Sequence, residues 1–200
     1  PMAFDVECKR TNAKFHKNQN QKDIKSHHYI ISFDPKDAVE CGLTGQRAQE
    51  LSMELTRKIF PGYQVLVITH TDGGNHSGNI HTHIVINSVR KYDAPREGYM
   101  TQPGDHKAGR KHRSTNKFLE HFKKEVMEMC EREGLHQIDL LSPAPEKVTE
   151  AEFRTRANGQ KKMEQMNQAI KKEGLTPTAI VFQTQKDFLR KAIKECSRIA

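Results

Sequence analysis

Residues 79–88 read N-I-H-T-H-I-V-I-N-S, and the side chains in this stretch alternate in character from one residue to the next. Successive side chains on a β-strand point to opposite faces of the sheet. One face would be largely aliphatic and is made of Ile80, Thr82, Ile84 and Ile86. The other face would carry two imidazoles and an amide and is made of His81, His83, Val85 and Asn87. The stretch therefore predicts a strand that packs its aliphatic face against helices and exposes its polar face.

Two further strands are expected nearby. The sequence Y-Q-V-L-V-I-T-H at 63–70 is rich in β-branched residues, and a glycine-rich turn, T-D-G-G-N-H-S-G-N, joins it to the strand at 80–89. This turn chemistry predicts that the two strands pair as a hairpin. The stretch S-H-H-Y-I-I-S-F at 26–33 is predicted to be a strand as well, ended by a D-P-K-D turn. L-H-Q-I-D-L-L at 135–141 is a candidate for a fourth, edge strand.

Helices are predicted before, between and after these strands. Apolar residues recur at helical spacing after Thr44, which can cap a helix running to about Phe60, and after Ser114 or Thr115. The first stripe is Ala48, Leu51, Leu55 and Ile59, and the second is Phe118, Leu119, Phe122, Val126, Met129 and Cys130. Residues 3–17 should form another helix. We expect an α/β (α+β) fold, with a central antiparallel sheet flanked by helices and the H-T-H strand near its middle.

The chain is predicted to have two parts. The core would span 1–145 and end near S-P-A-P-E-K at 142–147, whose composition is typical of a boundary. A basic helical extension would occupy 146–200, with a final amphipathic helix from about Gln185. Two hundred residues suit one domain with such an appendage.

Composition narrows the class of partner. The chain holds 33 Lys and Arg against 25 Asp and Glu, a net charge of +8, which favours a polyanionic partner, most commonly nucleic acid. The same charge is also compatible with a soluble basic protein that has no such partner. The four cysteines, Cys8, Cys41, Cys130 and Cys196, are widely spaced and are expected to be free thiols in a reducing compartment. No apolar run approaches the roughly 18 residues that span a bilayer, so a cytoplasmic location is expected.

Three histidines and an aspartate can meet on the predicted hairpin. His70 ends one strand, Asp72 follows it, and pairing would bring His70 beside His81 and His83. Three imidazoles form an open metal site, in which substrate or water supplies the remaining ligands and Asp72 orients a ring from behind. Such ligands suit Mn, Co, Ni or Zn, and incoming phosphate oxygens would make Mg usable. The alternative is that each histidine is only hydrogen-bonded within the fold.

The same residues resemble a known motif. H-T-D, followed after a short loop by H-T-H-I-V-I-N-S, resembles the third motif of conjugative relaxases, H-x-D…H-x-H-x-x-x-N. Relaxases belong to the HUH endonucleases, and this copy looks most like the MOBP type, mobilisation nucleases carried by mobile elements of Gram-positive bacteria. The likeness extends to S-H-H-Y-I-I-S-F, N-S-V-R-K, H-R-S-T-N-K-F-L and E-G-L-H-Q-I-D-L-L, covering about residues 1–160.

The resemblance implies site- and strand-specific DNA nicking and joining at an origin of transfer, the step that initiates conjugation. In that family a tyrosine attacks the scissile phosphate and forms a 5′-phosphotyrosyl link. By position, His70, His81 and His83 match the metal-binding histidines, Asp72 the orienting acid and Asn87 the terminal asparagine of the motif. The implied cofactor is a divalent ion, Mn or Mg first, with Zn, Ni or Co possible. The implied partners are single-stranded and hairpin DNA, with accessory transfer proteins.

The nucleophile departs from this pattern. In the family the tyrosine lies in an N-terminal motif, whereas the four tyrosines here are Tyr29, Tyr63, Tyr92 and Tyr99, all within or after the first strand. We therefore expect a relaxase core without its N-terminal segment, which binds metal and DNA and cleaves poorly. A sheet edge left open by that loss would favour a dimeric or swapped assembly.

Basic residues predict where DNA would bind. Next to the histidines and in the loop before the second long helix these are Arg90, Lys91, Lys107, Arg110, Lys111 and Arg113. In the extension they are Arg154, Arg156, Lys161 and Lys162. They would neutralise phosphates and make binding depend steeply on salt. The extension could enter the major groove of a DNA hairpin, or be an exposed helix that folds on DNA.

The sequence is also compatible with two other functions. One is a DNA-binding module in which the metal is only structural, and the other is a replication-type HUH nuclease. A closed coordination shell would favour the first, and a shell with an open position would favour chemistry.

Overall fold

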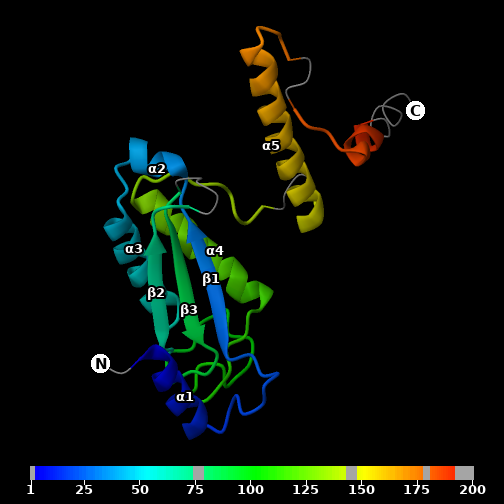
Figure 1. Ribbon diagram of the computed structural model, residues 1–200. Helices are drawn as coiled ribbons and strands as arrows, with labels where there is room; N and C mark the ends of the chain where they lie inside the picture. The colour runs from blue at the N-terminus through cyan, green and yellow to red at the C-terminus, as the bar shows by residue number, and fades with distance from the viewer. Residues whose placement is uncertain (1–2, 74–78, 143–147, 178–180, 192–200) are drawn as a thin grey trace, which may run out of the picture. The chain divides into compact units, whose positions relative to one another are not determined.

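The alternating stretch forms the central strand of an antiparallel sheet. In a computed structural model, which describes residues 3–73, 79–142, 148–177 and 181–191, β3 (His81–Asn87) lies between β1 (Ser26–Ser32) and β2 (Val65–His70). Both neighbours pair with β3 antiparallel, as Figure 1 shows. The predicted hairpin and the central place of the H-T-H strand are confirmed. The register sets His70 opposite His81, which places the candidate ligands at one end of the sheet.

Two helices cover one face of this sheet. They are α3 (Gly45–Ile59) and α4 (Asn116–Arg132), which lie behind the strands in Figure 1. The Thr44 and Thr115 side chains cap them by accepting hydrogen bonds from Arg47 N and Phe118 N. The buried core between helices and sheet includes Ile31, Ala48, Leu51, Leu55, Ile59, Ile84, Ile86, Phe118 and Met129. The two predicted stripes are confirmed except at Leu119, which is 37% exposed.

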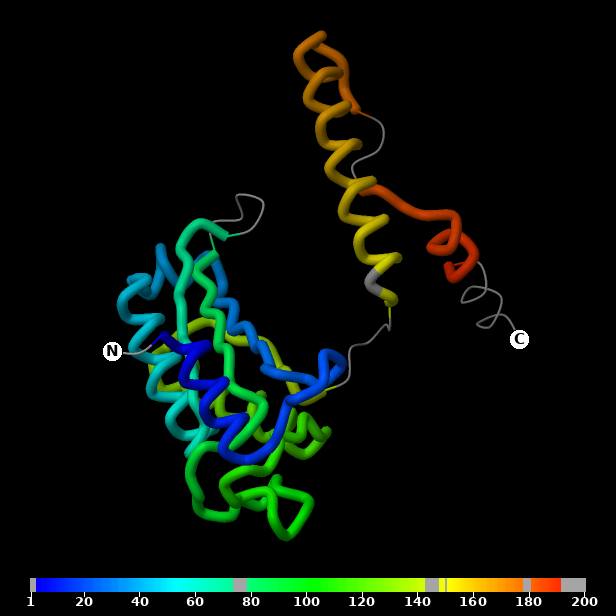
Figure 2. Tube along the Cα trace, turned by 60° about the horizontal axis from the view of Figure 1, so that its bottom comes forward, coloured from blue at the N-terminus to red at the C-terminus, as the bar shows by residue number. Residues whose placement is uncertain are grey.

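The first helix lies at the end of the sheet away from the histidines. It is α1 (Phe4–Lys14), seen in front of the strands in Figure 2. Its Glu7 carboxylate accepts a hydrogen bond of 3.3 Å from the Gln64 amide, just before β2, and pairs with Lys91 at 3.5 Å. Polar contacts therefore hold α1 where β2 begins and β3 ends.

Two predicted elements were wrong. The D-P-K-D stretch begins a short helix, α2 (Pro35–Glu40), because Asp34 and Asp37 form a capping box around a proline at its first turn. Residues 135–141 form no strand. The Asp139 carboxylate accepts hydrogen bonds from Leu141 N and Ser142 N, a local turn that competes with strand pairing, and Ile138 is 74% exposed.

The chain divides into two compact units, Pro1–Pro143 and Ala144–Ala200. This division lies beside the boundary expected at 145, although residues 143–147 are outside the described ranges. The second unit contains α5 (Glu150–Lys172) and a helical segment at 185–191. The rest of the predicted final helix, with Cys196, also lies outside those ranges. None of the helices in the described part of the chain is both long enough and apolar enough to span a bilayer.

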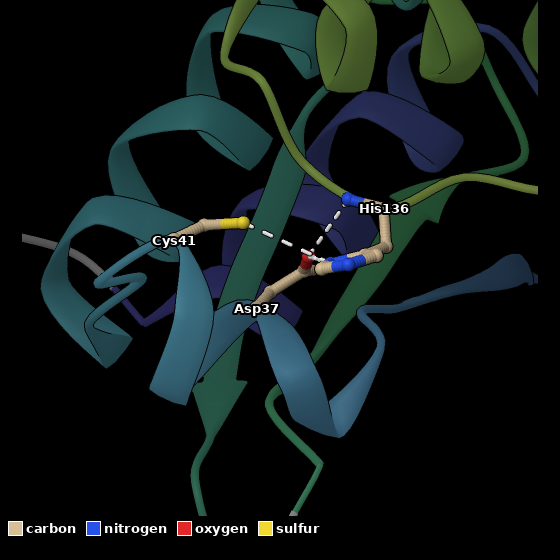
Figure 3. Close-up of side chains that lie close together, drawn as sticks. All are labelled: Asp37, Cys41 and His136. Atoms are coloured by element: carbon tan, nitrogen blue, oxygen red, sulfur yellow. Dashed lines mark hydrogen bonds and ion pairs between the residues drawn. The ribbon is translucent and has the colours of Figure 1, made fainter.

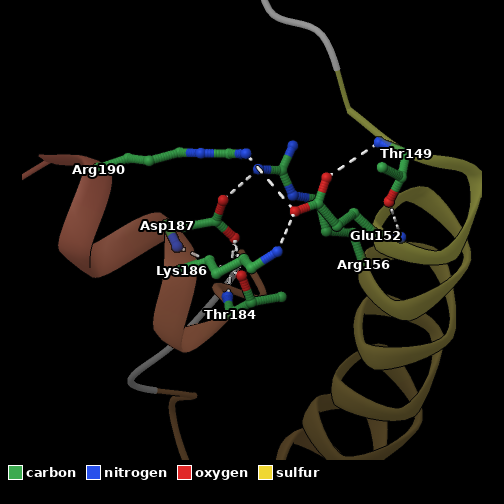
Figure 4. Close-up of polar contacts among 7 residues, drawn as sticks. All are labelled: Thr149, Glu152, Arg156, Thr184, Lys186, Asp187 and Arg190. Atoms are coloured by element: carbon green, nitrogen blue, oxygen red, sulfur yellow. Dashed lines mark hydrogen bonds and ion pairs between the residues drawn. The ribbon is translucent and has the colours of Figure 1, made fainter.

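Ion pairs hold the second unit together (Figure 4). Glu152 closes the capping box of α5 with Thr149 and also accepts from the Lys186 ammonium at 2.7 Å. The Arg156 guanidinium pairs with the Asp187 carboxylate. These contacts lower the pKa of Glu152 and of Asp187 to about 2 in each case, chiefly through hydrogen bonds from Lys186 and from Thr184, respectively. The two carboxylates thus connect α5 to the segment at 184–190.

A buried histidine makes the stability of the first unit sensitive to acid. Burial lowers the pKa of His112 to about 3, and His27 and Arg90 add to the effect. Its Nε2 lies 2.8 Å from the Tyr29 hydroxyl, and its ring centroid lies 4.7 Å from that of Phe118. The neutral ring is therefore the native form.

Acidification below pH 6.5 should destabilise the fold through His112. The unfolded chain takes up a proton near pH 6.5, whereas folded His112 stays neutral until about pH 3. The stabilisation that neutral His112 gives the folded state is complete above pH 6.5. It declines as the pH falls from 6.5 toward 3, and the free energy of unfolding is about 2 kcal/mol lower at pH 5. Urea unfolding at pH 7 and pH 5 measures this loss, which should shrink in His112→Gln. Equal losses in both proteins would contradict the assignment.

Candidate metal centre and nucleic-acid interface

Three histidine rings gather on the face of the sheet that helices α3 and α4 do not cover. The ring centroid of His70 lies 5.3 Å from that of His81 and 5.1 Å from that of His83, and the His81 and His83 centroids are 5.1 Å apart. Antiparallel pairing of β2 with β3 and the two-residue repeat of β3 produce this arrangement. The structure therefore brings together the three side chains predicted as ligands.

The spacing of the rings fits a shared metal ion. With metal–nitrogen bonds of about 2.0–2.1 Å, three imidazoles on one ion have ring centroids roughly 5 Å apart. The ring nitrogens of these histidines do not all lie within 4.8 Å of one another. Among the described residues, one group of potential ligands meets that distance, and it lies elsewhere in the first unit. Binding an ion here requires rotation of at least one imidazole within a cluster that is already assembled.

The Nδ1 atoms of two rings have outer partners, which is the arrangement that leaves Nε2 to a metal. His81 Nδ1 lies 3.4 Å from the Asn79 carbonyl oxygen, which can only accept a hydrogen bond. His83 Nδ1 lies 2.7 Å from Nε2 of His28 on β1. If His83 donates from Nδ1, its Nε2 lone pair is left for a metal, as in other sites where an outer partner fixes the tautomer. Burial first, and then the neighbouring histidines, lower the pKa of His83 and favour its neutral form.

His28 was not among the predicted site residues. S-H-H-Y-I-I-S-F contains two adjacent histidines, His27 and His28, of which alternation allows only one to face the metal. The register shows which one, since His28 pairs with Val85 and shares the open face with His83, whereas His27 packs against His112 with ring centroids 4.8 Å apart. The signal in the sequence was strand alternation, but applying it required knowing that β1 lies beside β3.

The predicted orienting residues lie elsewhere. Asp72 follows β2, is exposed, and makes no hydrogen bond to the three rings in the described part of the chain. Asn87 is 1% exposed, its amide donates to Gln64 Oε1 at 3.0 Å, and its own oxygen accepts from Val89 N. It lies four residues beyond His83 at the other end of β3, so the structure shows it supporting the backbone there.

None of the four tyrosines lies beside His70, His81 or His83. The Tyr29 hydroxyl lies on the helix side of the sheet, 2.7 Å from Ser114 Oγ, and burial raises its pKa. Tyr63 lies beneath the Arg90 guanidinium, and burial raises its pKa to about 12. Tyr99 donates to the Ile59 carbonyl oxygen. Tyr92 is exposed, but its backbone N donates to Gly62 O, at the opposite end of β2 from His70.

Arg90 does not fit the prediction of a DNA contact. It is 3% exposed, and its guanidinium donates to the carbonyl oxygens of Pro61 and Asp105 while covering the Tyr63 ring. A cation directly after a β-strand suggested a phosphate contact, but the loop at 90–113 folds back over it. Arg90 thus holds that loop against the start of β2.

The other predicted contacts of the first unit differ in how they are paired. Lys91, Lys107 and Lys111 form ion pairs with Glu7, Asp93 and Asp23, respectively. Arg110 and Arg113 line a concavity of about 710 Å³ together with Lys17 and Lys111. This basic concavity is the stronger candidate for binding phosphates, because its Lys17, Arg110 and Arg113 form no ion pair within the described residues, whereas a cation already paired with a carboxylate, as Lys111 is, gains less from a phosphate.

The extension keeps only part of its predicted basic surface. Arg154, Lys161 and Lys162 are exposed on α5, whereas Arg156 is half-buried and paired with Asp187. The arginine predicted to contact DNA here instead stabilises the unit itself.

Comparisons with known proteins agree with the motif. The family model for the nuclease domain of MobA/VirD2-like relaxases matches residues 3–135, which include the whole of the histidine hairpin. The chain belongs to the MobA/VirD2-like relaxases. The resemblance read from the H-T-D and H-T-H-I-V-I-N-S residues is therefore confirmed at the level of the family, one of DNA nucleases that normally use a divalent metal ion.

Relatives of this relaxase domain extend well beyond it. A protein named rlx from Staphylococcus aureus is 30% identical over 145 residues, which are 72% of this chain and 35% of the relative. A second rlx protein from the same organism is 34% identical over 127 residues, or 64% of this chain and 32% of its own length. The chain thus spans about a third of the length of these relatives. No solved structure matches it.

Proposed function

We propose that this relaxase domain nicks and rejoins one DNA strand at an origin of transfer, with a divalent ion held by His70, His81 and His83. The observation that carries the proposal is the convergence of these three rings, 5.1–5.3 Å apart, on a sheet face that the core helices leave open. All ligands come from one hairpin, so the remaining coordination positions face away from the sheet, where a phosphate can approach.

The surroundings of the histidines suit a DNA strand. Ile30 and Ile68 flank His83 across the two strand pairings and are 54% and 45% exposed. They can pack against the sugars and bases of a strand whose phosphate lies at the histidines. When bound, Mn²⁺ or Mg²⁺ (or Zn²⁺, Ni²⁺ or Co²⁺) would polarise the phosphate oxygens. His28 would keep His83 in the ligating tautomer, and the rigid sheet would fix the phosphate for in-line attack.

The attacking group is proposed to be a tyrosine other than the four in this chain. Tyr29, Tyr63 and Tyr99 are at least half-buried, and their side chains contact Ser114, Arg90 and the Ile59 carbonyl oxygen, respectively, away from the three histidines. Tyr92 lies near the start of β2, whereas His70 ends that strand. A tyrosyl–DNA link conserves the energy of the broken phosphodiester bond for rejoining. This domain would then supply metal and DNA binding for a step completed by a tyrosine outside residues 1–200.

A paired comparison tests the proposed function. The 200-residue chain and a chain extended upstream with its natural residues are incubated with labelled single-stranded origin DNA and Mn²⁺. We expect both to bind DNA, but only the extended chain to form a covalent adduct. The relaxase mechanism proposed here fails if the extended chain forms none. An adduct on the 200-residue chain, lost in one Tyr→Phe variant, would instead identify one of the four tyrosines as the nucleophile.

Open coordination favours a nuclease over a DNA-binding module in which the metal is only structural. A purely structural ion would be enclosed by protein ligands, whereas His70 is exposed and the other two rings are half-buried. The match to relaxases favours transfer over replication initiation. We further propose hairpin DNA and accessory transfer proteins as partners, a dimeric or swapped assembly, and a cytoplasmic location. Sedimentation with and without hairpin DNA tests the partner and the assembly.

Neutralising the basic concavity should weaken DNA binding without affecting the metal. Replacing Arg113 with glutamine removes a cation from the concavity shared with Lys17 and Arg110. We expect the dependence of log K on log salt to flatten by about 0.7, the value for one phosphate contact on a single strand. Fluorescence anisotropy with labelled single-stranded DNA at several salt concentrations measures the slope. Arg57→Gln, an exposed arginine on α3 behind the sheet, is the matched control and should leave the slope unchanged. An unchanged slope in Arg113→Gln would exclude the concavity.

A further inference from the structure

A second group of potential metal ligands lies on the helix side of the first unit. Asp37 lies in the first turn of α2 and Cys41 caps its C-terminal end, so the two side chains, four residues apart, share one face of that helix. His136 comes from the irregular segment after α4, 95 residues further along than Cys41. Figure 3 shows the three side chains pointing toward one another. One carboxylate, one thiol and one imidazole thus meet from two parts of the chain that are distant in sequence.

We propose that Asp37, Cys41 and His136 bind a second metal ion, of the zinc type, which fastens the segment leaving α4 to α2. The potential ligand atoms all lie within 4.8 Å of one another. His136 Nδ1 is 3.7 Å from Cys41 Sγ and 2.9 Å from Asp37 Oδ1. A tetrahedral ion with bonds of about 2.0–2.3 Å keeps its ligand atoms roughly 3.3–3.8 Å apart. The nitrogen–sulfur distance already lies in this range, and the nitrogen–oxygen distance is a few tenths of an ångström below it.

The outer contacts already hold two of the ligands in a binding orientation. His136 Nε2 lies 3.1 Å from the Glu40 carboxylate, which leaves Nδ1 for the ion in the carboxylate–histidine–metal pattern. Asp37 is fully buried, and its carboxylate accepts hydrogen bonds from the backbone N of Asp34 at 3.1 Å and of His136 at 2.8 Å. The carboxylate is thus fixed before an ion arrives, while exposed Cys41 gives the ion access.

The ligand types separate this site from the histidine cluster. A thiolate with an imidazole selects zinc or cobalt, whereas Mg²⁺ and Mn²⁺ prefer oxygen donors. One thiolate and one carboxylate also balance the two positive charges of the ion. Binding would release the thiol proton, which is directed at the Gly134 carbonyl oxygen 3.4 Å away. An ion here would close a long loop and stabilise the irregular segment by restricting the unfolded chain.

Cobalt substitution provides the test, because a thiolate ligand gives Co²⁺ a charge-transfer absorption that histidine and carboxylate ligands do not. The chain is titrated with Co²⁺ alone, and zinc per chain is measured after dialysis. We expect the thiolate band in the unaltered chain and its loss in Cys41→Ser, with one fewer bound zinc ion per chain. Glu40→Gln should keep the band but weaken Co²⁺ binding by about 10–100-fold, as for other outer-shell changes.

Matched controls keep the two metal sites distinct. Cys8→Ser removes a different thiol and should leave the band intact, as should His81→Ala, which alters only the histidine cluster. The inference is overturned if Co²⁺ binds without a thiolate band, or if Cys41→Ser retains it. Absence of Co²⁺ binding by folded, unaltered chain would also overturn it and leave a metal-free hydrogen-bonded contact. Because Cys41 is exposed, its serine variant should fold, which circular dichroism checks.

Discussion

Replacing His81 with alanine should weaken Mn²⁺ binding by more than about 100-fold, because altering an outer-shell residue alone already costs 10–100-fold. His81 is one of the three proposed ligands, with the His70 and His83 ring centroids 5.3 and 5.1 Å from its own. Two imidazoles would remain, too few for the three-ligand shell typical of open sites. In the upstream-extended chain, adduct formation should fall with metal occupancy.

Isothermal titration with Mn²⁺ measures the loss directly, and the labelled-DNA assay measures its consequence. His121→Ala is the matched control, since His121 lies on α4, where its ring stacks on Tyr99 and its Nε2 is near Glu125, on the opposite side of the sheet. It should bind Mn²⁺ like the unaltered chain. His81 is half-buried on an open face, so the variant should remain folded. Unchanged Mn²⁺ affinity in folded His81→Ala would disprove the ligand assignment, whatever the DNA assay shows.

The part of this site that lies on one hairpin was predictable from sequence. The two-residue repeat of β3 fixes which side chains share a face, and the short turn brings β2 alongside. His70, His81 and His83 needed only these local rules. The aliphatic face of β3 and the stripe from Ala48 to Ile59 were predictable for the same reason, since each periodicity is a property of one element.

Contacts between distant segments were not predictable. His28 reaches His83 only because β1 pairs with β3, 55 residues away in sequence. Arg90 is buried because its loop folds back onto Pro61. His136 was placed in a strand, whereas it meets Asp37 across 99 residues. In each case the deciding partner is remote, so composition and local spacing carried no information about it.

Replacing Ile84 with alanine should be the most destabilising single change among the sheet residues. Ile84 is 0% exposed on the central strand and belongs to the core under α3 and α4. Truncating a fully buried isoleucine costs about 2–5 kcal/mol, through lost transfer free energy and an unfilled cavity. That is a large share of the 5–15 kcal/mol by which domains are stable. The melting temperature of the first unit should fall by roughly 10 °C.

The same substitution on the opposite face provides the control. Ile30 lies on β1 beside His83 and is 54% exposed, so Ile30→Ala removes the same atoms without opening a core cavity. Its cost should stay within about 1 kcal/mol, because little buried area is lost. Urea unfolding followed by far-UV circular dichroism compares the two variants, using the transition of the first unit. Comparable losses would contradict the two-faced sheet, because only burial distinguishes these isoleucines. We expect a large loss of unfolding free energy in Ile84→Ala and weaker DNA binding in Ile30→Ala. This result would distinguish the face of the sheet that stabilises the fold from the face proposed to bind DNA.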